Sequence, residues 1–161
     1  MSIHSPLCRP LRSRQRGLAA VEAAILLPLL LFLMMATAEV GRYIYTYNAL
    51  TKMVEAGARY LSQNAYLGTT RVLDVDTNAA KKNVTGNIVV YGNIAGSGTA
   101  LIQGLTAANV AVAQSGDDAV QVEIVNFQYS PMFASRLAFF GGNGLDLRVP
   151  MSAGVVMRAL N

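Results

Sequence analysis

One uninterrupted apolar segment near the amino terminus constrains the fold of this chain more than any other feature. Residues 18–38 begin directly after Gly17 and contain one charged side chain, that of Glu22. At about 1.5 Å of rise per residue, a helix of this length measures roughly 31 Å, which matches the hydrocarbon core of a bilayer. The sequence therefore predicts a membrane-spanning helix over residues 18–40.

The basic residues of the chain are unevenly placed around this segment. Thirteen Lys and Arg against nine Asp and Glu give a net charge of +4, but four of the arginines lie before residue 17. They are Arg9, Arg12, Arg14 and Arg16. Positive residues beside a first span favour the cytoplasmic side, so we expect a cytoplasmic amino terminus and an outer location for the residues after about 40. Without residues 1–17 the basic and acidic side chains balance at nine each, which argues against nucleic acid as a partner.

Glu22 is the most informative single residue. A carboxylate at the centre of a membrane helix costs on the order of 2.5–3.5 kcal/mol, so such a group is usually retained for a function or a partner. Glu22 lies near the start of the segment, where this cost is lower. A function or a partner therefore explains its presence better than chance does.

The order Gly17, Leu18 and then Glu22, as the fifth residue of the apolar helix, resembles the processing site of type IV pilin-like proteins. In that group a prepilin peptidase cleaves after the glycine and leaves the hydrophobic helix on the product. The resemblance implies that residues 1–17 are a basic leader peptide that is removed. It also implies that Leu18 becomes the new amino terminus and that Glu22 is the charge used in recognition and assembly.

Further segments extend this resemblance over about residues 14–62. Taken together at their spacing, they are similar to the TadE-like family, which are minor pseudopilins of the tight-adherence (Flp, type IVc) pilus system. The segments are Arg16–Glu22, Leu27–Leu31, Glu39–Arg42, Asn48–Thr51 and Glu55–Tyr60. Members commonly carry an aromatic residue directly after the glutamate, where this chain has Ala23.

The resemblance implies a single-pass protein of the bacterial inner membrane that helps to initiate, prime or join a short pseudopilus. Its expected partners are the prepilin peptidase, other minor pseudopilins, the major pilin, the inner-membrane assembly platform and membrane lipid. Pro28 removes one backbone hydrogen bond from the membrane helix, and we expect a kink there that neighbouring helices tolerate. We therefore place Pro28 beside Glu22 among the residues expected to serve assembly.

The residue types of the mature chain argue against an enzyme. The single cysteine, Cys8, and the single histidine, His4, both lie in the expected leader. Their loss removes disulfides, Cys–His and Ser–His–Asp nucleophiles and the common zinc sites. An envelope enzyme remains an alternative only if a carboxylate pair or a metal is assembled from other acidic residues. The candidates are Asp74, Asp76, Asp117, Asp118 and Glu123.

The segment from Asp74 to Asn78 imitates the opening of a calcium loop, but Ala79 stands at the sixth position, where such loops need glycine. We therefore expect no metal and no cofactor.

A second alternative concerns the end of the apolar segment. Ala36-Thr37-Ala38 is an A-x-A sequence, which is typical of signal-peptidase sites. Cleavage after Ala38 predicts a secreted soluble periplasmic protein, and the absence of any cleavage predicts a signal-anchored one. Against the cut, the apolar segment of about 21 residues exceeds the usual length of about 7–15 residues.

A helical pattern continues beyond the span to about Tyr66. Apolar residues recur at steps of three and four, which is typical of one buried helix face. They are Tyr43, Tyr47, Leu50, Val54, Ala58, Leu61 and Ala65. We expect an amphipathic extension over residues 41–68, with a stop at Leu67–Thr70, and an outer domain over residues 69–161. Tyr43, Tyr45 and Tyr47 are expected to form an interfacial aromatic belt.

The outer part of the chain predicts a mixed structure. We expect a short helix over residues 76–84, a strand over 87–91 and a flexible loop over 92–104. A hairpin is expected over 110–124, with a bulge near Val125 or Asn126. The final strand, over 145–157, is expected to lie at a sheet edge or to be broken at Pro150. The short apolar piece 137–140 is a surface helix or a partner-facing loop. A sheet with one apolar face needs a covering layer. The predicted fold class is therefore α+β and pilin-like, with the long amino-terminal helix packed on a small antiparallel sheet.

Overall fold

The computed structural model of the protein describes residues 12–67, 72–132, 136–137, 145–146 and 148–160. The chain divides into two compact units, Met1–Ala38 and Glu39–Asn161. The long helix α1 (Arg12–Gln63) contributes to both units. His4, Cys8 and Arg9 lie outside the described residues, as do Gly68–Thr70 of the expected helix stop.

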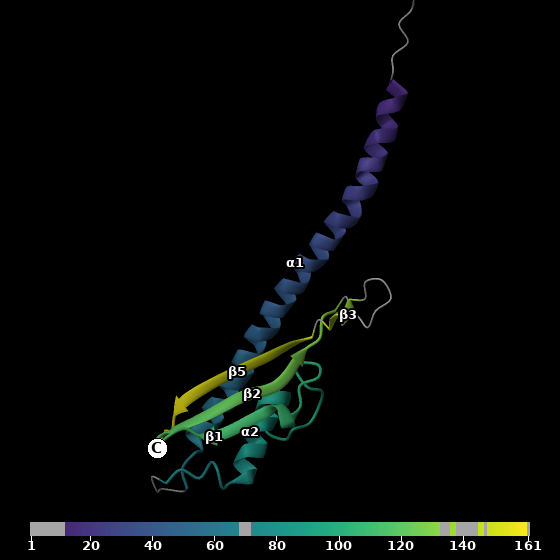
Figure 1. Ribbon diagram of the computed structural model, residues 1–161. Helices are drawn as coiled ribbons and strands as arrows, with labels where there is room; N and C mark the ends of the chain where they lie inside the picture. The colour runs from purple at the N-terminus through teal and green to yellow at the C-terminus, as the bar shows by residue number, and fades with distance from the viewer. Residues whose placement is uncertain (1–11, 68–71, 133–135, 138–144, 147, 161) are drawn as a thin grey trace, which may run out of the picture. The chain divides into compact units, whose positions relative to one another are not determined.

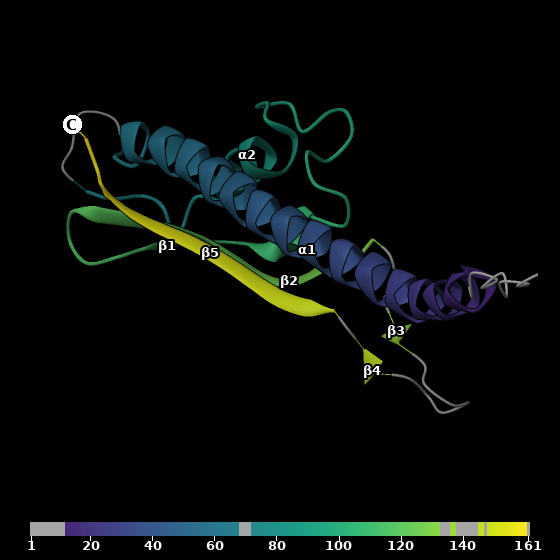
Figure 2. The same cartoon turned by 90° about the horizontal axis from the view of Figure 1, so that it is seen from above.

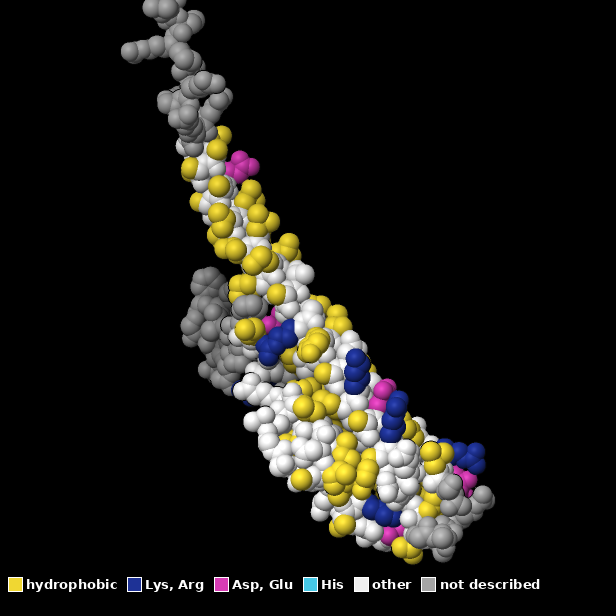
Figure 3. All heavy atoms as spheres, turned by 180° about the vertical axis from the view of Figure 1, so that it is seen from behind, with side chains coloured by type: hydrophobic (Ala, Val, Ile, Leu, Met, Phe, Trp, Pro, Cys, Tyr) yellow, Lys and Arg dark blue, Asp and Glu magenta, His cyan; other side chains and the backbone are white. Residues whose placement is uncertain are grey.

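The first unit is the amino-terminal part of α1. Every side chain over residues 18–38 is exposed, and the large apolar ones range from 38% exposed at Met35 to 74% at Leu18. Hydrophobic side chains cover the face of this segment that Figure 3 shows. A helix that is apolar all round is stable only when something else covers it, such as a protein core or lipid. By length and composition this is one helix that can cross a membrane, and none of its most apolar window is buried within the chain.

The second unit places α1 and a second helix, α2 (Ala79–Tyr91), on one side of an antiparallel sheet (Figures 1 and 2). The sheet contains β1 (Val110–Gln114), β2 (Ala119–Tyr129) and β5 (Val149–Arg158), in the order β1-β2-β5. A 3-10 turn, η1 (Ala107–Asn109), precedes β1. Two short strands, β3 (Arg136–Leu137) and β4 (Leu145–Asp146), form a separate pair. The predicted α+β class, a long amino-terminal helix on a small antiparallel sheet, is confirmed.

The apolar stripe of α1 forms one side of the core. Leu50, Val54, Ala58 and Leu61 are fully buried, as the periodicity predicts. Tyr47 is an exception, because its side chain is 46% exposed.

Helix α1 ends at Gln63, three residues before the expected end at Tyr66. Asn64 stops it, because its side-chain amide donates to the Tyr60 carbonyl at 2.8 Å and its backbone N–H donates to the Leu61 carbonyl at 3.1 Å. The chain then turns, and Tyr66 pairs with Leu73 in an isolated β-bridge.

Helix α2 confirms the helix expected over 76–84 from residue 79 onward, and because it continues to Tyr91, the strand expected over 87–91 is wrong. The Asn78 side chain caps its start by accepting from the Lys81 backbone N–H at 3.2 Å, and Gly92, with φ of 72°, ends it. Its buried residues are Thr85, Gly86, Val89 and Val90. Their spacing makes one helical face, so packing outweighs the strand propensity of the β-branched residues.

Gly57 explains how α2 packs so closely on α1. A Cβ atom added to Gly57 would lie 2.5 Å from Cγ2 of Val89 and 3.4 Å from Cγ2 of Thr85. Any other residue type there requires a shift of the Val89 side chain or of one helix. The small side of α1 at this position therefore holds the two helices together through van der Waals contact.

The bulge expected near Val125 or Asn126 is confirmed. The pairing of β2 with β5 shifts register between Ile124 and Phe127, and Asn126 has a positive φ of 56°. The extra residue changes which positions of β2 face the core, from Val120, Val122 and Ile124 to Phe127 and Tyr129. The side-chain amide of Asn109 donates to the Val125 carbonyl at 3.2 Å and to the Asn126 carbonyl at 3.3 Å, which holds the bulge.

The carboxyl-terminal strand lies at the edge of the sheet, as one of the two expectations had it, and the break expected at Pro150 is wrong. Strand β5 lies at the sheet edge and has Pro150 as its second residue, opposite Gln128. The break precedes Pro150, because β4 ends at Asp146 and β5 starts at Val149. Leu137 of the apolar piece belongs to β3, and residues 138–140 lie outside the described part.

Candidate processing and assembly site

Gly17, Leu18 and Glu22 all lie within α1, in the first compact unit. Leu18 and Glu22 are four residues apart, so they share one face of the helix and are separated by one turn. Both side chains are exposed, and within the described part of the chain Glu22 makes no hydrogen bond and no ion pair. The carboxylate of Glu22 is therefore not used within the described part of the fold.

The fold itself does not require glycine at position 17. A Cβ atom added there would meet no other atom within 4 Å, and glycine inside a helix is less favourable than alanine by about 0.5–1 kcal/mol. The backbone of Gly17 is helical and does not have a positive φ, so backbone conformation does not require glycine either. A requirement for Gly17 must then come from something that approaches the chain at this residue.

Pro28 lies inside α1, and its side chain is exposed together with the rest of the apolar segment. The helix continues on both sides of the proline. Because proline has no backbone N–H, the carbonyl one turn before Pro28 lacks its usual donor. In a membrane, where water is absent, this carbonyl needs a donor from another group. The role of Pro28 in assembly stays a prediction.

In the second unit, the carboxylate of Glu39 connects α1 to the end of the sheet. The sequence alone indicated no such role for this residue. The hydroxyl of Tyr129 donates a hydrogen bond to Oε1 of Glu39, and the backbone N–H of Met132 donates to Oε2 at 3.2 Å. We call Glu39, Tyr129 and Met132 the Glu39 clamp. It attaches the end of β2 and the segment after it to the first turn of α1 in this unit.

Two neighbours of the Glu39 clamp pack on the Tyr129 ring. Tyr43 meets it edge to face, with centroids 5.4 Å apart and planes at 85°, and the guanidinium of Arg42 lies 5.6 Å from the ring centroid. Burial, and then the hydrogen bond and negative charge of Glu39, raise the pKa of Tyr129 to about 12, while Arg42 acts in the opposite direction. Tyr129 is thus a protonated donor to Glu39 at any physiological pH.

Sequence reasoning missed the Glu39 clamp. The two partners are 90 positions apart, and no local pattern links them. The one available signal was the change of phase after Val125, which predicts that Tyr129 faces the core and α1. Of the tyrosines expected in an aromatic belt, Tyr43 is therefore engaged in the core of the unit, whereas Tyr45 and Tyr47 are exposed.

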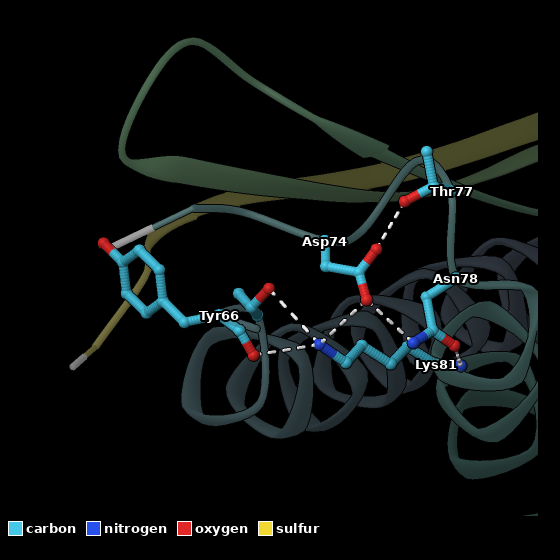
Figure 4. A network of polar contacts seen from close by, with 6 residues as sticks. Tyr66, Asp74, Thr77, Asn78 and Lys81 are labelled. Atoms are coloured by element: carbon cyan, nitrogen blue, oxygen red, sulfur yellow. Dashed lines mark hydrogen bonds and ion pairs between the residues drawn. The ribbon is translucent and has the colours of Figure 1, made fainter. Parts of the chain in front are cut away.

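A second polar network fixes the turn at the far end of α1 (Figure 4). Lys81 donates to the carbonyls of Ala65 at 3.4 Å and Tyr66 at 3.1 Å, and its Nζ lies 3.8 Å from Oδ2 of Asp74. The Thr77 hydroxyl donates to Asp74 Oδ1, and the Asn78 amide donates to Oδ2 at 2.9 Å. These hydrogen bonds, followed by the charge of Lys81, lower the pKa of Asp74 against the opposing effect of burial.

This network explains the segment that imitates a calcium loop. Both oxygens of Asp74 are used within the fold by Thr77, Asn78 and Lys81. Of the other acids considered for a catalytic pair, Asp76 accepts from the Gln114 backbone N–H at 3.2 Å and Asp118 lies 3.6 Å from Arg158. Among the residues that the structure describes, no three acidic, histidine or cysteine side chains gather in a way that could hold a metal ion.

Comparison with known families supports the resemblance found in the sequence. Residues 17–59 match the family model described as TadE-like protein, which confirms the resemblance over this range. This family is associated with the tight-adherence pilus and is not known for catalysis. Searches of curated proteins and of solved structures give no match.

Proposed function

We propose that this chain, whose residues 17–59 match the TadE-like family, is a minor pseudopilin that takes part in the initiation, priming or tip of a tight-adherence (type IVc) pilus. The observation that carries the proposal is the apolar helix over residues 18–38. Its side chains are all exposed and its only charge is Glu22, one turn after Leu18. Such a helix needs lipid or neighbouring helices around it.

A prepilin peptidase acts after Gly17 in this proposal and removes the basic leader 1–17. The cut creates an ammonium group on Leu18, one helical turn from Glu22. Near the start of a helix an acidic side chain is stabilising by about 0.3–1 kcal/mol, and pairing with the ammonium offsets part of the cost of keeping Glu22 in lipid. The same carboxylate can instead meet the ammonium of an adjacent subunit, which makes Glu22 an assembly charge.

The topology follows from the arginines of the leader. Residues 18–40 span the inner membrane with the amino terminus in the cytoplasm, and the residues after about 40 lie in the periplasm. The partners of the chain are the prepilin peptidase, other pseudopilins and the major pilin of the same pilus, and the inner-membrane assembly platform.

The alternative of signal-peptidase cleavage after Ala38 stays open on one specific observation. The boundary between the two compact units falls between Ala38 and Glu39, so this cut would leave the second unit whole. Glu39 would become the terminal residue and its side chain would keep its bonds to Tyr129 and Met132. The two proposals predict different amino termini for the mature protein.

Substitution of Glu22 tests the assembly role. We expect Glu22→Ala to remain in the membrane, because removing a charge makes the apolar segment more favourable in lipid, and to abolish or strongly reduce piliation. Glu55→Ala is the control, since Glu55 lies on the same helix outside the apolar segment. Normal piliation in the Glu22→Ala strain, with membrane levels equal to wild type, would contradict the assembly role.

A further inference from the structure

A groove of about 710 Å³ opens in the second unit between α1, the segment before Leu105 and the end of β2. Its polar lining comes from three different parts of the chain, and the exposed side chain of Met132 also lines it. The lining residues that matter here are Arg42, Thr46, Gln103, Gln128, Ser130 and Met132. Arg42 is the one charged side chain among the described residues that line it.

Arg42 is prepared to bind an anion. Its guanidinium lies on the face of the Tyr129 ring, 5.6 Å from the centroid, which holds the side chain in place. Within the described part of the chain no hydrogen bond or ion pair uses its N–H groups. Glu39, the nearest acid along the helix, directs both oxygens at Tyr129 and Met132 instead. The planar fork of donors on Arg42 is thus free for a partner such as a phosphate.

The position of Arg42 in the sequence indicates which anion is at hand. Arg42 follows Ala38, the last residue of the apolar segment, by four residues. Around it on α1, Val40 is 59% exposed and Tyr45 is 75% exposed. Exposed apolar and aromatic side chains directly after a membrane span are typical of the headgroup region. Phosphates are concentrated in that layer of a bilayer.

We propose that this groove binds the headgroup of an anionic phospholipid of the outer leaflet. Arg42 takes the phosphate. The hydroxyls of Thr46 and Ser130 and the amides of Gln103 and Gln128 take a hydroxylated headgroup such as glycerol, and Met132, 70% exposed, lies against the apolar part of the lipid. The proposal rests on the membrane anchorage within the proposed function, and it is independent of the role in the pilus.

The test uses the full chain in lipid nanodiscs that contain either phosphatidylcholine alone or an equal mixture with phosphatidylglycerol. Native mass spectrometry counts the lipids that stay bound after release from the disc. We expect wild type to retain phosphatidylglycerol about fivefold over phosphatidylcholine, the effect of one basic side chain near a charged surface. Arg42→Gln should lose the preference. Arg59→Gln is the matched control and should keep it, because Arg59 is an exposed arginine on the same helix outside the groove.

Further arms separate the sources of the effect. Arg42→Lys keeps the charge but loses the planar fork, so a reduced preference is expected. Soluble glycerol phosphate at millimolar concentration should fail to displace the lipid, and full displacement would show a phosphate site rather than a lipid site. Arg42→Gln should lower the temperature of thermal unfolding only slightly, because Arg42 is exposed and the variant loses only the contact with the Tyr129 ring.

Two results would overturn the proposal in distinguishable ways. A wild-type preference that is absent, or that survives Arg42→Gln unchanged, would refute the lipid site and leave the proposed function intact. Failure of the wild-type chain to enter nanodiscs of either composition would refute the membrane anchorage, and with it both proposals. Binding of an acidic peptide from a pilus subunit to Arg42, in preference to lipid, would assign the groove to a protein partner instead and would also refute the lipid site.

Discussion

Glu39 and Tyr129 are joined by a hydrogen bond although they lie 90 positions apart in the sequence. Glu39 lies on α1 directly after the apolar segment, and Tyr129 is the last residue of β2. The bulge at Asn126 makes this contact possible, because it moves Phe127 and Tyr129 to the core side of β2. Without the extra residue, Tyr129 would face away from α1. The clamp therefore depends on an irregularity in the sheet as well as on its two side chains.

Removal of the Tyr129 hydroxyl tests the strength of the Glu39 clamp. We expect Tyr129→Phe to lower the free energy of unfolding by about 1.5–3 kcal/mol, because a hydrogen bond to a carboxylate is lost while the ring still packs on Tyr43. Urea unfolding of the full chain in detergent measures this change. Tyr45→Phe is the control, since the Tyr45 ring is exposed, and it should leave the stability unchanged. Equal stabilities of the two variants would contradict a stabilising clamp.

The same pair gives a pH dependence at the alkaline end. The pKa of Tyr129 is raised to about 12 in the folded protein, from 10.0 for an unperturbed tyrosine. The stability that Tyr129 contributes is therefore fully present below pH 10 and is lost as the pH rises from about 10 through about 12. We expect the difference in stability between wild type and Tyr129→Phe to be constant from pH 7 to 9 and to shrink above pH 10. A difference that grows with pH over that interval would contradict the assignment.

The contact of α1 with α2 predicts a large effect of one methyl group. Gly57→Ala places a Cβ atom 2.5 Å from Cγ2 of Val89, so we expect a loss of about 1–3 kcal/mol in the free energy of unfolding. Gly41→Ala is the matched control on the same helix, because a Cβ there meets nothing within 4 Å, and it should stabilise the helix by up to about 1 kcal/mol.

A double variant shows whether Val89 is the cause. If it is, Val89→Ala should cost less in the Gly57→Ala chain than in the wild-type chain. Thermal unfolding of the four chains gives the two costs. Costs that are equal in both backgrounds would mean that the added methyl is accommodated elsewhere.

Gly17 gives a prediction about processing that is free of folding effects. A side chain at position 17 meets no other part of the fold, so Gly17→Leu should enter the membrane and keep its helix. We nevertheless expect most of the cleaved product to disappear, because the peptidase must approach the backbone at this residue. Gly41→Leu, also in open space, should be cleaved like wild type. Cleavage of Gly17→Leu at the wild-type rate would place the cut elsewhere.

The parts of the fold that follow from periodicity were predictable from the sequence. These parts are the apolar stripe from Leu50 to Leu61, the hairpin and the bulge after Ile124. Each depends on which residues face the core and which face solvent, and this pattern can be read within the segment itself. The resemblance, for its part, indicated Gly17, Leu18 and Glu22, and the structure adds that their side chains or backbone are accessible on α1. Their roles in processing and assembly stay predictions.

Other parts depend on contacts between distant segments. The residues Ile88 to Tyr91 have the composition of a strand, but the absence of a side chain at Gly57 lets them pack as a helix. Likewise, nothing near Glu39 in the sequence shows that Tyr129 will meet it. A single sequence does not indicate such pairs, because neither residue of a pair departs from the pattern of the segment in which it lies.

The amino-terminal mass of the protein recovered from membranes tests the central claim most directly. We predict a chain that begins at Leu18 when the prepilin peptidase is present and an uncleaved chain, with its basic leader, when the peptidase is absent. A chain that begins at Glu39 in both strains would contradict processing as a pseudopilin and would establish cleavage by signal peptidase after Ala38.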